Sequence, residues 1–129
     1  MFTYFIRRRR VVRRRRKPVG VARYTARKEE ARAFVVKTLD VYNAHYGFSI
    51  GRITIRNQRS RWGSCSKKGN LNFNFRIIEL PEHLAEYIVV HELCHIGEFN
   101  HSGAFWDRVA ETVPDWKTCR AELRGKYIS

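Results

Sequence analysis

The chain has 129 residues, which is enough for one domain with a modest core. Its net charge of +14 would suit a nucleic-acid-binding domain, but residues 1–28 hold 12 of the 26 basic side chains and none of the 12 acidic ones. Residues 29–129 therefore have 14 basic and 12 acidic side chains and a net charge of only +2, which predicts a basic arm over residues 1–24 and a nearly neutral domain over residues 25–129.

The basic arm contains the run RRRRVVRRRRK at residues 7–17, followed by Pro18 and Gly20. Two interpretations stay open. The run could contact the phosphates of nucleic acid or another polyanion, or it could be a solvated segment without a fixed partner. The side chains that would make the phosphate contacts are Arg7, Arg8, Arg9, Arg10, Arg13, Arg14, Arg15 and Arg16.

The first half of the predicted domain contains one helix and a small sheet. Apolar residues recur every three or four positions over residues 25–46, which predicts a helix that begins at Thr25 as its N-cap and ends at Gly47. Residues 50–57 favour a half-exposed strand, and strict alternation over residues 71–78 predicts a second one. We expect these segments to form a small antiparallel sheet whose last two strands are joined by a hairpin.

The second half is predicted to be helical. Pro81 begins a helix that continues through the histidines at 91 and 95, because proline is well tolerated in a first helical turn. Residues 102–125 are typical of two short helices separated at Val113–Pro114. The fold class is therefore α+β, with a sheet packed on the histidine-bearing helix and further helices beside it.

Cysteine usage and hydropathy exclude two other classes of protein. Cys65, Cys94 and Cys119 are odd in number and form no C-x-x-C pair, which argues against a disulfide framework and a cysteine-only zinc site. The apolar start is too short for a signal peptide, and no stretch is long enough to cross a membrane. We expect a cytoplasmic protein without membrane contact.

The sequence H-E-L-C-H at residues 91–95 points to a metal site. On a helix, His91 and His95 lie on one face and can reach the same ion, while Glu92 can take a proton from a water bound to that ion. The pattern is typical of zinc hydrolases. It predicts Zn²⁺ as the cofactor and Glu92 as the catalytic residue.

The third metal ligand is either Glu98 or His101. A continuous helix would place His91 and Glu98 about 10.5 Å apart along its axis, which is too far for one tetrahedral ion. The geometry favours His101, provided that the chain reverses at Gly97 and Asn100, two residue types that tolerate a left-handed conformation. A metzincin is rejected, because Glu98 replaces its glycine and no methionine follows the histidines.

Four motifs in the same order resemble those of the YgjP-like metallopeptidases, relatives of the SprT and WLM peptidases. They are I-R-N-Q-R-S-R-W-G-S-C-S at 55–66, G-N-L-N at 69–72, V-V-H-E-L-C-H at 89–95 and N-H-S with F-W at 100–106. The resemblance covers residues 28–126. It implies a zincin-like fold, a small antiparallel sheet over an active-site helix, with zinc held by His91, His95 and His101.

The expected activity is hydrolysis of peptide bonds in a peptide or protein substrate. Asn70, Asn72 and Arg61 are candidate substrate-binding residues, and the strand containing residues 71–75 is a candidate edge for an extended peptide. The alternative is a nucleic-acid-binding protein with a structural zinc site, recruited through the arm. Glu92 argues against that alternative, because a structural site has no need of a base and closes its fourth position with a protein ligand.

Overall fold

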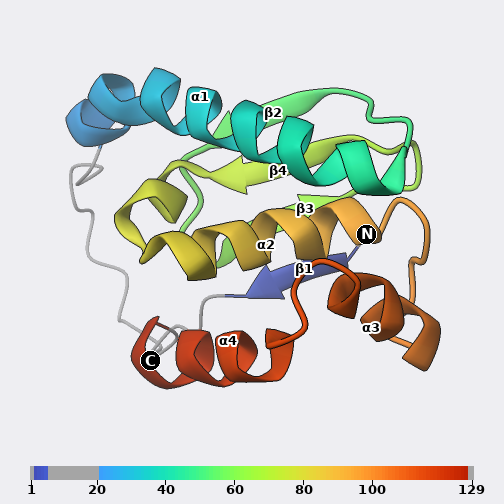
Figure 1. Cartoon of the computed structure of the whole chain (residues 1–129). Coiled ribbons are helices and arrows are strands. Elements are labelled where there is room, and N and C mark those ends of the chain that lie inside the picture. Colours follow the sequence, from blue (N-terminus) through green and yellow to red (C-terminus); the bar gives the residue numbers. More distant parts are fainter. Residues whose placement is uncertain (1, 6–20, 128–129) are drawn as a thin grey trace.

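The computed structural model describes residues 2–5 and 21–127 of the chain (Figure 1). The arginines from Arg7 to Arg16, proposed for polyanion binding, lie outside the described residues. The elements, in chain order, are β1 (Phe2–Phe5), α1 (Val21–Tyr46), β2 (Ile53–Arg56), β3 (Arg61–Cys65), β4 (Leu71–Asn74), the 3-10 helix η1 (Phe75–Glu79), α2 (Glu82–Cys94), α3 (Gly103–Ala110), α4 (Trp116–Glu122) and the π-helical turn η2 (Leu123–Tyr127).

The four strands form one mixed sheet in the order β1-β3-β4-β2. The predicted hairpin is confirmed, since β3 and β4 pair antiparallel. The expectation of a wholly antiparallel sheet is wrong, because β2 pairs parallel to β4. The hairpin occupies one edge of β4, so β2 pairs with the other edge, and β1 adds antiparallel to the outer side of β3. Alternating apolar residues identify a strand but do not choose its partner.

The predicted strand over residues 71–78 is half wrong, since β4 ends at Asn74 and continues as η1. The buried side chain of Asn74 explains this change. Its amide group donates hydrogen bonds to the carbonyls of Gln58 and Arg61, and its oxygen accepts one from the backbone N–H of Arg76. The residue thereby anchors the link between β2 and β3 and begins the 3-10 helix. These side-chain hydrogen bonds outweigh the strand propensity of the residues that follow.

Helix α1 begins at Val21, four residues before the predicted N-cap at Thr25, whose hydroxyl donates to the carbonyl of Val21 at 2.9 Å. The expectation for the helix start is wrong, but Gly47 ends the helix as predicted, with φ of +68° and its N–H bonded to the carbonyl of Asn43. The predicted boundary between arm and domain after residue 24 falls inside α1. That division stays a prediction.

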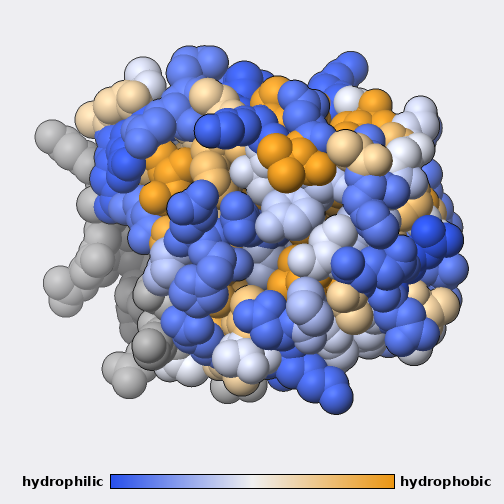
Figure 2. All heavy atoms as spheres, in the orientation of Figure 1, coloured by the Kyte–Doolittle hydropathy of each residue, from blue (hydrophilic) through white to orange (hydrophobic). Residues whose placement is uncertain are grey.

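Helix α2 is the centre of the molecule (Figure 1). It packs on β3 and α1, while α3 and α4 contact it on the side away from α1. Every residue from Tyr87 to Cys94 is buried, which is typical of a helix covered on all sides. The two C-terminal helices separated at Val113–Pro114 are confirmed. The outer surface in Figure 2 is mostly hydrophilic, with apolar residues in separate small patches.

In the described part of the chain, no helix is both long enough and apolar enough to cross a membrane.

Candidate metal centre

Three histidines converge at the C-terminal end of α2. His91 lies in the last turn of the helix and His95 directly after its end, and both are buried. His101 comes from the link between α2 and α3 and is exposed. The Nε2 atom of His95 lies 3.1 Å from that of His91 and 3.0 Å from that of His101, and the remaining Nε2 pair is 3.3 Å apart. The prediction of a cluster of these three residues is confirmed.

The spacing of these nitrogens fits a metal ion. Donor atoms about 2.0–2.1 Å from a tetrahedral ion lie about 3.3 Å from one another. The observed Nε2 separations of 3.0–3.3 Å match that figure. The Nδ1–H group of His95 donates to the backbone carbonyl of Glu98 at 3.0 Å, which leaves the Nε2 lone pair of this ring for the ion.

The chain reverses after α2 by a mechanism that differs from the prediction. Gly97 does not adopt a positive φ, nor does Asn100, so a left-handed turn is wrong. Tight turns continue the helix instead, with the N–H groups of residues 95–97 bonded to the carbonyls of residues 92–94. Gly97 is needed for a different reason: a Cβ atom there would lie 2.7 Å from Cε1 of Phe48. Glycine lets the ring of Phe48 pack directly on the turn.

The choice between Glu98 and His101 is resolved in favour of His101. The described metal-binding cluster consists of the three histidines, and Glu98 contributes its backbone carbonyl rather than its carboxylate. Directly after His101, the hydroxyl of Ser102 accepts the N–H of Phe105 and caps α3. The start of this helix fixes the position of the third imidazole.

Aromatic rings hold the imidazoles in place. Phe105 is fully buried and stacks on His95, with ring centroids 4.3 Å apart and an interplanar angle of 11°. Trp106 stacks on His101 at 5.8 Å and also on Trp116 of α4 at 4.0 Å. The sequence analysis placed Phe105 and Trp106 in a family motif but predicted no contact between these rings and the histidines. Their contact with the histidines depends on how α3 and α4 fold back, for which the sequence contains no local signal.

Glu92 lies beneath β3, with none of its surface exposed. A Cβ atom on Gly63 would be 3.1 Å from Cγ of Glu92 and 3.3 Å from its Oε2, so the strand backbone runs directly against this side chain. Neither carboxylate oxygen has a hydrogen-bond partner among the described residues. An unpartnered buried carboxyl is costly. Such a group fits a site where an ion and its water supply the missing partners.

The electrostatics of the site keep its histidines neutral. Burial lowers the pKa of His91, with smaller contributions from the charges of His95, His101 and Arg120. Burial lowers the pKa of His95 to about 4, and burial followed by the charge of Arg120 lowers the pKa of His101. Neutral imidazole is the form that binds a metal. Burial also raises the pKa of Glu92.

The three candidate substrate-binding residues lie on the hairpin and make structural contacts. The side-chain oxygen of Asn70 accepts the N–H of Arg52 at 2.7 Å, and Asn72 bonds both Arg56 and Ser64. The carbonyl of Arg61 accepts from Asn74. A role of Asn70, Asn72 and Arg61 in substrate binding stays a prediction. The candidate edge at residues 71–75 is wrong, because β4 lies inside the sheet between β3 and β2.

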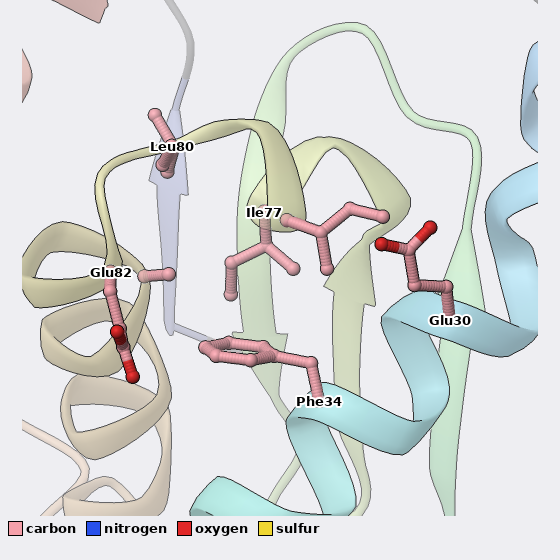
Figure 3. Close-up of a pocket in the computed structure, with 7 residues that line it drawn as sticks. Glu30, Phe34, Ile77, Leu80 and Glu82 are labelled. Atoms are coloured by element: carbon pink, nitrogen blue, oxygen red, sulfur yellow. The ribbon is translucent and has the colours of Figure 1, made fainter.

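A separate recess of about 340 Å³ lies between α1, η1 and the start of α2 (Figure 3). Phe34 and Ile77 point toward each other in it, with Glu30 and Glu82 on either side. Its lining consists of Glu30, Phe34, Ile77, Ile78, Leu80, Glu82 and Ala85. None of the three histidines lines this recess, so it is distinct from the metal centre.

Comparison with known proteins agrees with the geometry. The sequence model of the family described as "YgjP-like, metallopeptidase domain" matches residues 6–126, which extends the resemblance into the basic arm. No curated protein matches the chain.

Two similar solved structures are the metallopeptidase zymogens abylysin of Pyrococcus abyssi and jannalysin of Methanocaldococcus jannaschii. Abylysin is 22% identical with a TM-score of 0.60, and the match covers 74% of this chain and 93% of that one. Jannalysin is 25% identical with a TM-score of 0.57, and the coverage is 72% and 92%.

Proposed function

The chain belongs to the YgjP-like metallopeptidase family, and we propose that it cleaves protein substrates with Zn²⁺ held by His91, His95 and His101 and with Glu92 as the general base. The observation that carries this proposal is the convergence of three neutral imidazoles on one point beside a buried carboxyl that has no hydrogen-bond partner among the described residues. Three imidazole nitrogens at this spacing suit zinc and leave one position for water or substrate.

When bound, the metal would supply Lewis acidity, which polarises the scissile carbonyl and makes water acidic enough to attack at neutral pH. The carboxylate of Glu92 accepts the proton of the attacking water and returns it to the leaving amine. Its burial under Gly63 excludes bulk solvent and fixes its direction. His91 and His95 are held rigidly by α2 and Phe105, while His101 faces solvent, so the substrate enters from the side of His101.

Latency is a second part of the proposal, favoured by the zymogen state of the two similar proteins. β3 covers Glu92, and β1 pairs with the outer side of β3, with Tyr4 opposite Gly63. An extended peptide would add to the sheet at this same edge by main-chain hydrogen bonds. A Tyr4→Pro substitution, which cannot donate to the ladder, should raise the rate of hydrolysis. An unchanged or lower rate would argue against latency of this kind.

The arginine-rich arm supports a further proposal, recruitment to nucleic acid or another polyanion. The observation that favours it is the concentration of 12 basic and no acidic side chains in residues 1–28. Replacing the eight arginines between Arg7 and Arg16 by serine should abolish salt-dependent binding to DNA while the peptidase activity remains. Binding that survives this replacement would exclude the arm as the contact.

The proposed hydrolysis is tested by a Glu92→Gln variant loaded with zinc. The substitution keeps the shape of the side chain and removes the base, so hydrolysis of a denatured protein should fall by about a thousandfold, the middle of the range for general-base catalysis. Zinc stoichiometry should stay unchanged. Glu82→Gln, in the exposed first turn of the same helix, is the matched control and should hydrolyse the substrate at the same rate as the parent chain. Equal activity of Glu92→Gln and the parent would refute the proposal.

A further inference from the structure

A cationic cleft lies along α4 and the start of η2. Its volume is about 220 Å³. The lining residues, which we call the α4 cleft, are Trp116, Lys117, Arg120, Ala121 and Arg124. Three of the five are cations and none is an acid. Such a lining attracts an anionic group.

Neither Asp115, the N-cap of α4, nor Glu122 lines the cleft. Glu122 bonds His83 at 2.9 Å, and Asp115 lies 3.9 Å from the thiol of Cys119. Within residues 21–127, none of the three cations of the α4 cleft forms an ion pair with a carboxylate. Their charges are therefore available to a ligand.

Arg120 connects the cleft to the metal centre. Its guanidinium lies over the ring of Trp106, 5.3 Å from the centroid, and Trp106 stacks on His101. Trp116 stacks on the same indole ring, 4.0 Å away, and adds a flat apolar wall. A substrate that reaches the exposed His101 meets Trp106, whose ring contacts both Arg120 and Trp116.

We propose that the α4 cleft binds a carboxylate of the peptide substrate, so that the enzyme prefers peptides with an acidic group close to the scissile bond. This inference rests on the proposed peptidase function. The carboxylate is either the side chain of Asp or Glu or the C-terminus of the peptide. Arg120 is the main specificity-determining residue, because a guanidinium held over an aromatic ring can bind a carboxylate through two parallel hydrogen bonds in a fixed, bidentate geometry. Lys117 and Arg124 strengthen the positive field.

Single-stranded nucleic acid is the competing ligand, since tryptophan beside basic residues also forms a platform for stacked bases. The contact of Arg120 with Trp106, the ring that stacks on His101, favours the peptide carboxylate. An oligonucleotide therefore enters the experiment as a competitor.

The test measures binding without cleavage, using the full chain with Glu92→Gln and zinc bound. Three peptides share one sequence: one has an internal Glu and an amidated C-terminus, one has Gln and a free C-terminal carboxylate, and one has Gln and an amidated C-terminus. Calorimetry should give about tenfold tighter binding for at least one acidic peptide than for the neutral one, as for a charge-assisted hydrogen bond. The first two peptides distinguish the two sources of carboxylate.

Adding Arg120→Gln should remove this preference, whereas Lys37→Gln, an equal loss of charge on the exposed side of α1, should keep it. Arg120→Lys should keep part of it. Because Arg120 packs on Trp106, a double variant at the exposed Lys117 and Arg124 serves as a second test if Arg120→Gln lowers thermal stability. Equal binding of all three peptides overturns the inference, and so does a preference that survives both sets of substitutions.

Competition and cleavage complete the test. Tight binding of a single-stranded oligonucleotide that Arg120→Gln abolishes, without any preference among the peptides, overturns the inference in favour of nucleic acid. If the parent chain cleaves acidic and neutral peptides at the same rate, the inference fails while the proposed function stands. If the acidic preference in binding depends on Arg120 but the parent chain cleaves nothing, the α4 cleft stands and the hydrolytic proposal fails.

Discussion

Substituting Gly63 by alanine tests how closely β3 holds the proposed general base. The new Cβ atom would lie 3.1 Å from Cγ of Glu92 and 3.1 Å from the backbone carbonyl oxygen of Asn72. Ordinary contacts of a Cβ atom begin at 3.4 Å, so each neighbour would have to move by about 0.3 Å, the difference between the two distances. Asn72 belongs to a strand paired on both sides, and the side chain of Glu92 is therefore the part that moves.

The expected effect on catalysis exceeds the effect on stability. A misplacement of about 1 Å costs about a hundredfold in rate, so a shift of a few tenths of an ångström should lower kcat by about threefold to tenfold. One extra methyl group should destabilise the fold by about 1 kcal/mol, the lower end of the usual cost of overpacking. A loss of this size lowers Tm by about 4 °C in a domain of this size. The zinc content should not change, because Gly63 does not touch the histidines' nitrogens.

The assay compares steady-state hydrolysis, zinc content and thermal unfolding of Gly63→Ala with those of Gly103→Ala. Gly103 begins α3, and a Cβ atom there meets nothing within 4 Å, so this control should match the parent chain in kcat and Tm. A variant Gly63→Ala that loses stability but keeps its full kcat would refute the role assigned to Glu92. An equal loss of kcat in both variants would refute the steric argument.

Gly97→Ala should destabilise by about 1–3 kcal/mol, seen as a lower Tm by calorimetry, because its methyl group would overlap the ring of Phe48. Burial raises the pKa of Cys65 to about 12 and that of Cys119 to about 11, so both thiols stay protonated at pH 8. Both should therefore react with a thiol reagent only after the protein is unfolded in urea. Rapid labelling of these thiols in the native protein would contradict this prediction. Zinc at 100 times its Kd should stabilise the parent chain by about 2.7 kcal/mol and thereby raise its Tm. A chelator should reverse this rise, and His101→Ala should strongly reduce it. A chelator without effect on Tm would exclude a metal bound to the folded protein.

Local patterns predicted the parts of the fold that depend on neighbours in the sequence. The four-residue spacing of His91 and His95 places both on one helical face, and a glycine such as Gly47 ends a helix wherever a left-handed residue is needed. The hairpin between β3 and β4 was likewise predictable, because alternating side chains and a polar turn determine it over a short range.

Contacts between distant residues decided what the sequence did not predict. The end of β4 at Asn74 depends on hydrogen bonds across 13 and 16 residues, from Asn74 to Arg61 and Gln58. The parallel pairing joins β2 to a strand that lies later in the chain, beyond β3. No local propensity contains that information. Strand glycines mark close backbone approach, so the position of Gly63 in the run R-W-G-S-C was a usable signal that β3 contacts a side chain below it.

In the candidate site, too, local patterns predicted some residues and contacts between distant residues placed the others. The three histidines and Glu92 could be identified because their spacing reflects the chemistry of one ion. The reversal that brings His101 back was predicted, but the role of Gly97 was not, since it depends on the ring of Phe48 from a segment 49 residues earlier. Arg120 reaches the site only because α3 and α4 fold back on α2.

We propose that the three histidines hold a zinc ion whose remaining position faces Glu92. An anomalous-difference map, measured above and below the zinc absorption edge on crystals of the protein grown with zinc, tests it most directly. We expect one peak within about 2.0–2.1 Å of the Nε2 atoms of His91, His95 and His101, with a water molecule as the fourth ligand within hydrogen-bond distance of Glu92. A peak elsewhere, or a fourth ligand supplied by a protein side chain such as Glu98, would contradict it.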